Sequence, residues 1–214
     1  MRAGAAAVTC AVVAAAVTAW GLSAKPAAVA APAAVQASRS AAASAQASDR
    51  LFISKAQLAQ ALASGTLDRP VKSLLAVERP LYFGDYHWND RGVPAGPTWI
   101  RIDLGSQLIS VFRAGHEIGT AVIVYGGDNK QTPLGKLHIL GKAKDHRSSL
   151  YDAEMPYTLR LTNDGVSIHA SDVRYGAATH GCIGVPLAFA QRLFAATKVG
   201  DEVTVVPATA HRLS

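Results

Sequence analysis

Apolar and polar residues alternate from residue 100 onward with the period of a β-strand that buries one face. In the first such segment, Ile100, Ile102 and Leu104 alternate with Arg101 and Asp103. Similar short segments predict strands at 108–113, 120–125, 137–140, 157–162, 166–169 and 201–206. Gly, Asn, Asp and Pro separate these segments and favour turns, and Asn163-Asp164-Gly165 is the clearest hairpin signal.

Helical spacing occurs twice. A capping-box pattern of Ser54 and Gln57, followed by Leu58 and Leu62, predicts a short helix over 55–64. A second helix is predicted after Pro186, with apolar pairs at 189/193 and 190/194 and a stop before Gly200. Residues 79–97 are rich in Pro, Gly, Asp and Asn and predict irregular connecting chain. Several short strands with one helix after residue 186 indicate a mainly β sandwich or barrel.

The N-terminal residues carry an export pattern. Arg2 precedes an apolar stretch from Ala5 to Leu22, and Ala28-Val29-Ala30 fits a cleavage site. We therefore expect a signal peptide over 1–30 and a flexible linker, rich in Ala, Ser and Pro, over 31–50. The alternative is an uncleaved membrane anchor, because the 18 residues from Ala5 to Leu22 lie near the lower limit for spanning a bilayer. Both interpretations place the rest of the chain in the periplasm or cell-wall space.

The remaining residues divide into three expected parts. Residues 51–97 form a short helical and irregular N-terminal segment, residues 98–207 the main domain, and residues 208–214 a C-terminal tail. The chain has 214 residues, of which 50% are hydrophobic and 17% charged. This composition excludes a disordered chain and allows one modest domain with appendages.

The charge balance is mildly basic. The formal charge of +6 comes from 21 basic and 15 acidic residues, and it falls by two, to +4, when Arg2 and Lys25 leave with the signal peptide. Such an excess suits an acidic polymer such as a cell wall. We expect no nucleic-acid partner, because no run of lysines and arginines is interleaved with aromatic residues.

The candidate chemistry centres on one cysteine. Cys10 leaves with the signal peptide, so Cys182 is a lone thiol in an oxidising compartment. A nucleophilic cysteine needs a nearby imidazole or positive dipole, because its pKa of about 8.5 leaves little thiolate at neutral pH. His169 ends a predicted strand and suits a general base. Gly181 lets backbone N–H groups face a developing oxyanion.

Two other interpretations of these residues stay open. A lone cysteine is often a small buried hydrophobe, with a neighbouring histidine as a structural group. Alternatively, His169, His180 and Cys182 could supply three zinc ligands. No H-x-x-E or C-x-x-C pattern supports zinc, so we expect no metal. Four other histidines show no ligand spacing and are expected on the surface or in a second layer; they are His87, His116, His138 and His146.

The motif resembles that of the L,D-transpeptidases with a YkuD-type catalytic domain, in which a histidine and a spacer precede [S/T]-H-G-C. Here His169 precedes Thr179-His180-Gly181-Cys182. The likeness runs from about residue 84 to residue 206. Further matching motifs are Gly84-Asp85-Tyr86-His87-Trp88, Gly96-Pro97, Thr132-Pro133-Leu134-Gly135, Asp145-His146-Arg147-Ser148, Met155-Pro156-Tyr157 and Asp164-Gly165-Val166-Ser167-Ile168-His169.

The resemblance implies a YkuD-like β-sandwich or barrel and a cysteine acyltransferase that needs no cofactor. The substrate would be a peptidoglycan tetrapeptide stem, cleaved between its third and fourth residues with release of D-alanine. The acyl group would pass to an amine of another stem or of an envelope protein, or to water in a carboxypeptidase side reaction.

The resemblance also assigns roles to individual residues. Cys182 would be the nucleophile and His169 the acid/base. Thr179 and His180 would support the loop, and backbone N–H groups near Gly181 and Cys182 would form the oxyanion hole. Tyr157 is a candidate for lining the acyl-donor cleft, or else a core residue.

One position departs from the family pattern. Two residues after the cysteine the family usually has Arg or Asn, whereas this chain has Gly184. Arg174 is a candidate substitute in substrate binding, or else an ordinary exposed loop residue. Gly184 motivates a second hypothesis, a catalytically weakened wall-binding or scaffolding protein. A third, a cysteine peptidase of the NlpC/P60 kind, fits less well, because there the cysteine precedes its histidine.

Overall fold

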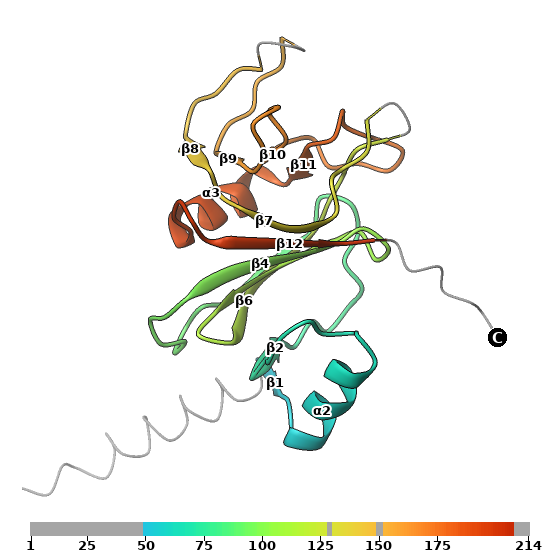
Figure 1. Cartoon of the computed structure of the whole chain (residues 1–214), viewed down its shortest axis with the longest axis vertical. Helices are drawn as coiled ribbons and strands as arrows, with labels where there is room; N and C mark the ends of the chain where they lie inside the picture. The colour runs from blue at the N-terminus through green and yellow to red at the C-terminus, as the bar shows by residue number, and fades with distance from the viewer. Residues whose placement is uncertain (1–48, 128–129, 149–151, 208–214) are drawn as a thin grey trace, which may run out of the picture.

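The structure is a computed structural model, and it describes residues 49–127, 130–148 and 152–207. These residues form twelve strands in two sheets and two helices (Figure 1). The mainly β fold predicted from the alternating pattern is confirmed. The expected signal peptide, residues 31–48 of the expected linker and the C-terminal tail lie outside the described residues. Within them, no helix has the length and apolar character needed to span a membrane.

The larger sheet has eight strands. Their order is β1 (Arg50–Phe52), β2 (Ser73–Leu75), β6 (His116–Val122), β5 (Leu108–Arg113), β4 (Thr98–Asp103), β12 (Glu202–Val206) and β7 (Gly135–His138), and β3 (Tyr86–Trp88) also pairs with β6. Neighbouring strands β4, β5 and β6 are antiparallel, whereas β12 runs parallel to β4. The C-terminal strand β12 lies between β4 and β7, and β7 forms the edge of the sheet.

The smaller sheet contains the candidate residue His169, and the candidate residue Cys182 directly precedes one of its strands. Its order is β11 (Ile183–Val185), β10 (Ser167–Ala170), β9 (Thr158–Arg160) and β8 (Gly141–Ala143). Strands β9 and β10 form the hairpin predicted at Asn163-Asp164-Gly165, and Gly165 has a φ of +97°, which favours glycine. Strands β10 and β11 are parallel, so His169 and Gly184 are register partners.

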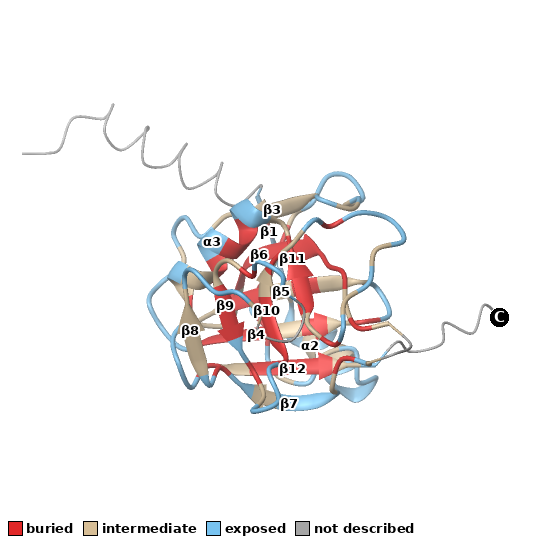
Figure 2. Ribbon diagram, turned by 90° about the horizontal axis from the view of Figure 1, so that it is seen from above, coloured by how far each residue is buried: buried red, intermediate tan, exposed pale blue. Residues whose placement is uncertain are grey.

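The main core lies between the two sheets and helix α3 (Leu187–Ala196). Figure 2 shows the buried residues gathered along the strands at the centre of the domain. Ile100 and Ile102 of β4 are fully buried, as the alternating pattern predicts. They share the core with Ile168, Ile183 and Phe189 from the smaller sheet and α3. Packing of this kind holds β10 and β11, and hence the candidate site, on a rigid base.

The N-terminal segment covers the other face of the larger sheet. Helix α2 (Lys55–Ala63) has the predicted capping box between Ser54 and Gln57. Residue Val71 joins Trp99 and Phe112 in a second buried cluster. The Trp99 and Phe112 rings stack with their centroids 4.0 Å apart, and the Arg69 guanidinium lies 4.5 Å from the centroid of Trp99. In Figure 1, α2, β1 and β2 lie together below the other strands of the larger sheet, whereas α3 lies above them.

Two local predictions are wrong. The irregular chain expected over 79–97 contains strand β3, which pairs with β6 and packs Trp88 against Phe189 of α3, with ring centroids 5.5 Å apart. Three residues are too short for a period-two signal, and their partner strand is about thirty residues away in sequence. The strand expected at 120–125 ends at Val122, because the chain leaves the sheet there and runs to the candidate site.

Candidate active site

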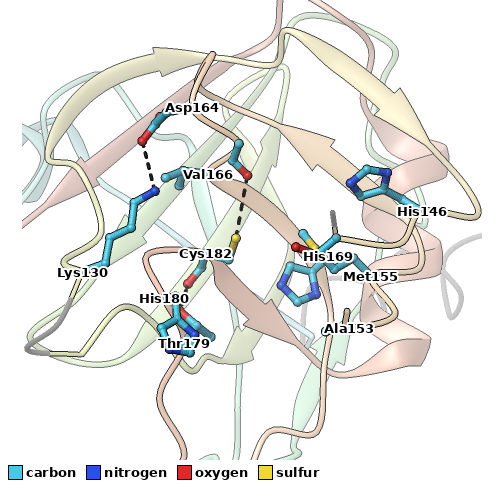
Figure 3. A pocket seen from close by; sticks show the side chains of 12 residues that line it. Lys130, His146, Ala153, Met155, Asp164, Val166, His169, Thr179, His180 and Cys182 are labelled. Atoms are coloured by element: carbon cyan, nitrogen blue, oxygen red, sulfur yellow. Dashed lines mark hydrogen bonds and ion pairs between the residues drawn. The ribbon is translucent and has the colours of Figure 1, made fainter. Parts of the chain in front are cut away.

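Cys182 and His169 line the same cavity, which has a volume of about 240 Å³ (Figure 3). The cysteine immediately precedes β11, and the histidine lies on the neighbouring parallel strand β10. Sheet pairing therefore brings together two residues separated by a loop. The other lining residues are Lys130, His146, Ser148, Ala153, Met155, Asp164, Gly165, Val166, Thr179 and His180.

The His169 imidazole is oriented by its own strand. Nδ1–H donates to the carbonyl oxygen of Ala170 at 2.8 Å. A neutral imidazole carries one proton, so this bond leaves Nε2 as an acceptor. Burial lowers the pKa of His169, and the charge of His146 lowers it further, against the opposing effect of the Ala170 carbonyl. At neutral pH the ring is therefore a neutral base.

The Cys182 thiol is held in its neutral form. Sγ lies 3.9 Å from the carbonyl oxygen of Gly165, to which the thiol donates (Figure 3). Burial raises the pKa of Cys182, and the Asp164 carboxylate raises it as well. The Ser167 backbone N–H and the Lys130 ammonium lower it. Because burial is the largest of these effects, the resting pair is a thiol and a neutral imidazole rather than a preformed ion pair.

The loop before the cysteine is attached to the chain that leaves β6. Val124 and Gly184 exchange two backbone hydrogen bonds of 3.0 and 2.8 Å. The Thr179 N–H donates to the Tyr125 carbonyl at 3.0 Å, and the Gly127 N–H donates to the Thr179 carbonyl at 3.1 Å. Segment 124–127 thus forms an additional backbone support for the candidate nucleophile.

Two threonine hydroxyls orient the backbone around Cys182. Thr179 Oγ1 donates to the Cys182 carbonyl at 2.5 Å. Thr132 Oγ1 donates to the Gly181 carbonyl at 3.0 Å and accepts a hydrogen bond from the Gly126 N–H at 3.0 Å. Gly181 has a φ of +96°, a backbone conformation that is unfavourable for residues other than glycine because of their Cβ atom.

The model of the L,D-transpeptidase catalytic domain, YkuD, matches residues 97–205, which contain all of these groups. The chain belongs to this family. The fold class and the family predicted from the sequence motifs are confirmed.

Solved structures with similar folds include several L,D-transpeptidases. The enzyme from Stackebrandtia nassauensis is 24% identical, with 54% of this chain and 60% of that chain covered and a TM-score of 0.49. L,D-transpeptidase 1 from Mycobacterium tuberculosis is 25% identical, with 51% and 60% covered and a TM-score of 0.45. The Enterococcus faecium enzyme is 25% identical, with 52% and 50% covered and a TM-score of 0.48. The chain thus spans at most 60% of the length of these relatives. Comparison with curated proteins gives no match.

Within this L,D-transpeptidase domain, the predicted loop residues lie beside the cysteine. Thr179 and His180 line the cavity, and Gly181 is buried between them and Cys182. Thr179 supports the loop through its bond to the Cys182 carbonyl.

The two candidate substrate-binding residues lie outside the cavity lining. Tyr157 packs edge-on against Phe194, with ring centroids 5.7 Å apart, and its hydroxyl accepts a hydrogen bond from Gln191 at 3.3 Å. Arg174 is exposed and forms an ion pair with Asp172 at 3.3 Å. These positions favour the core role for Tyr157 and the ordinary loop role for Arg174.

The cavity contains charged residues that sequence reasoning did not single out. Lys130 and Asp164 form an ion pair of 3.1 Å beside the thiol (Figure 3). His146 is exposed, as expected, and it also lines the cavity. Its place within a matching family motif was the signal that could have indicated this position. No group of three His, Cys, Asp or Glu side chains suited to a metal ion occurs among residues 49–127, 130–148 and 152–207.

The structure explains why glycine occupies position 184. A Cβ atom there would lie 2.6 Å from Cγ2 of Val124 and 2.7 Å from Cβ of Ser171. Both distances are far below ordinary carbon contacts. In this chain the space next to the residue is filled by two other side chains, so neither Arg nor Asn fits without rearrangement.

Proposed function

We propose that the protein is a peptidoglycan L,D-transpeptidase that acts through a thioester on Cys182. The observation that carries this proposal is the shared cavity. It places a thiol and an imidazole with an unprotonated Nε2 together inside an L,D-transpeptidase domain. The substrate would be a tetrapeptide stem, attacked at the carbonyl between its third and fourth residues.

The resting protonation states suggest how the first step proceeds. As Sγ attacks the carbonyl carbon, its proton moves to Nε2 of His169, because the neutral imidazole is the base next to a neutral thiol. The carbonyl oxygen becomes an oxyanion that accepts hydrogen bonds from backbone N–H groups near Gly181 and Cys182. When the peptide bond breaks, His169 returns the proton to the departing amine of D-alanine, and the acyl group stays on sulfur.

The second half of the reaction reverses these roles. An acceptor amine attacks the thioester carbonyl and gives its proton to His169, which then returns a proton to the departing Cys182 sulfur. We propose an amine of another stem peptide or of an envelope protein as acceptor, and water in a carboxypeptidase side reaction. This chemistry fits the expected export of the chain to the periplasm or wall space.

The test is the intact mass of the protein after incubation with a disaccharide tetrapeptide. The wild type should gain the mass of the acyl group and release D-alanine, whereas Cys182→Ala should do neither. His169→Asn should lose most of the acylation rate, and the matched variant His138→Asn should keep it, because His138 is exposed on β7. Release of D-alanine by Cys182→Ala would exclude this thiol as the nucleophile.

The mass measurement, combined with a sacculus-binding assay, addresses the second candidate function. Gly184 leaves no side chain at a position where the family usually has Arg or Asn, which is the observation that favours a wall-binding or scaffolding protein. Binding of the wild type to sacculi without any acylation would support that alternative.

A further inference from the structure

The buried hydroxyl of Thr132 connects two backbone segments behind the candidate nucleophile. The residue is 4% exposed and lies in the loop that follows segment 124–127. Its oxygen accepts a hydrogen bond from the Gly126 N–H and donates one to the Gly181 carbonyl, both at 3.0 Å. Thr132 therefore uses its donor and one acceptor position on backbone groups, and its side chain is held from both sides.

Glycine at position 126 permits this close arrangement. A Cβ there would lie 2.7 Å from the Thr132 nitrogen and 2.8 Å from the Gly181 Cα. Three backbone segments thus meet at distances that exclude any side chain. Within this close arrangement, the Gly181 carbonyl points to the Thr132 hydroxyl, from which it accepts its hydrogen bond.

The Gly181 carbonyl and the Cys182 N–H belong to one peptide unit. A trans peptide is planar, and its C=O and N–H point in opposite directions. Thr132 lies outside the cavity lining, whereas Cys182 lies within it. A Gly181 carbonyl directed at Thr132 therefore turns the Cys182 N–H away from Thr132 and toward the cavity side.

We propose that Thr132 is a positioning residue that aims the Cys182 N–H at the oxyanion formed during acyl transfer. This inference rests on the proposed function. Thr179 acts on the next peptide unit, since its hydroxyl binds the Cys182 carbonyl and so orients the Ile183 N–H. Of the two hydroxyls, Thr132 is the one that sets the Cys182 N–H.

The test compares two reactions of the same sulfur. Acylation by a carbapenem passes through a tetrahedral oxyanion, whereas alkylation by iodoacetamide does not. In Thr132→Val, acylation followed by intact mass should slow roughly tenfold to a hundredfold, since complete loss of one oxyanion donor costs about 10²- to 10³-fold. Alkylation at the same pH should change less than about twofold, because its rate follows the thiolate fraction.

Three further variants make the result specific. Thr132→Ser keeps the hydroxyl and should recover most of the acylation rate. Thr197→Val removes another buried hydroxyl that donates to a carbonyl, that of Leu193 at 2.7 Å, and should leave both rates unchanged. If Thr132→Val does not fold, Thr132→Ala removes the same donor without placing a methyl group against the Gly181 carbonyl, and it should show the same split between the two reactions.

The outcomes separate this proposal from the proposed function. Equal slowing of acylation and alkylation, no slowing of either, or failure of Thr132→Ser to recover would overturn the role of Thr132 alone. Absence of acylation in the wild type would overturn the thioester function and, with it, this inference.

Discussion

Replacing Gly184 with alanine should destabilise the fold by about 1–3 kcal/mol, the usual cost of forcing an extra carbon into a packed site. The new Cβ would lie 2.6 Å from Val124 Cγ2 and 2.7 Å from Ser171 Cβ. Both neighbours are anchored through their backbones. Val124 exchanges two hydrogen bonds with Gly184, and the Ser171 N–H donates to the Val185 carbonyl at 2.9 Å. Relief therefore requires movement of segment 124–127 or of the chain after β10.

Urea unfolding followed by tryptophan fluorescence measures this change, and thermal unfolding should show a fall of about 2–4 °C for each kcal/mol. Gly141→Ala is the matched control in strand β8, since a Cβ there would meet only the end of the Arg160 side chain, at 3.6 Å. It should change stability by less than about 0.5 kcal/mol, the usual range for substitutions without such contacts.

A compensating background tests the physical cause. In a protein that carries Val124→Ala and Ser171→Gly, the atoms that collide with the new Cβ are gone, so Gly184→Ala should cost much less than in the wild type. Gly184→Arg in the wild-type background should be more harmful than alanine. If Gly184→Ala is as stable as Gly141→Ala, the steric reasoning is wrong, and the glycine has another explanation.

Three further predictions concern charge. Lys130→Met should slow alkylation of Cys182 at neutral pH and Asp164→Asn should accelerate it, because the ammonium lowers and the carboxylate raises the pKa of the thiol; iodoacetamide rates that move in the same direction in both variants would contradict this. Acylation should decline on acidification only below pH 6.5, the ordinary pKa of imidazole, because burial lowers the pKa of His169; a pH–rate profile that falls above 6.5 would refute it. Burial raises the pKa of Glu117 above 4.5, so the folded state binds more protons than the unfolded state and stability falls as pH rises from 4.5 through the folded pKa. Glu117→Gln should lack this loss in urea unfolding between pH 4 and 8, and identical profiles would argue against it.

Features that depend on neighbouring residues in the chain could be predicted. The capping box placed helix α2 to within one residue of its end, and the alternation of β5 predicted both of its limits. The Asp164-Gly165 turn predicted the hairpin of β9 and β10, because glycine readily takes the positive φ found there. These patterns lie in residues close together in the sequence, so they can be recognised without knowing which residues pack against them.

Strand β3 and the end of β6 could not be predicted in the same way. Trp88 packs on Gly119, where a Cβ would lie 2.2 Å from the indole ring, and this contact joins segments that are distant in sequence. Likewise, the chain leaves β6 after Val122 because Val124 pairs with Gly184 instead of a neighbouring strand of the larger sheet. Pairing of this kind depends on which partner is available in the folded chain.

For the candidate site, the sequence indicated which residues could carry the chemistry, namely Cys182 and His169. A lone thiol after a histidine, with glycine beside it, is compatible with a nucleophile, a base and a loop open to an oxyanion, but also with a structural cysteine or a zinc site. The resemblance to the L,D-transpeptidase motif is what assigned the roles. The protonation states of the thiol and the imidazole, and the orientation of the groups around them, could not be predicted from the sequence. They follow from burial, from the Ala170 and Gly165 carbonyls and from the Thr132 hydroxyl. Those contacts exist only after residues far apart in the chain have packed together.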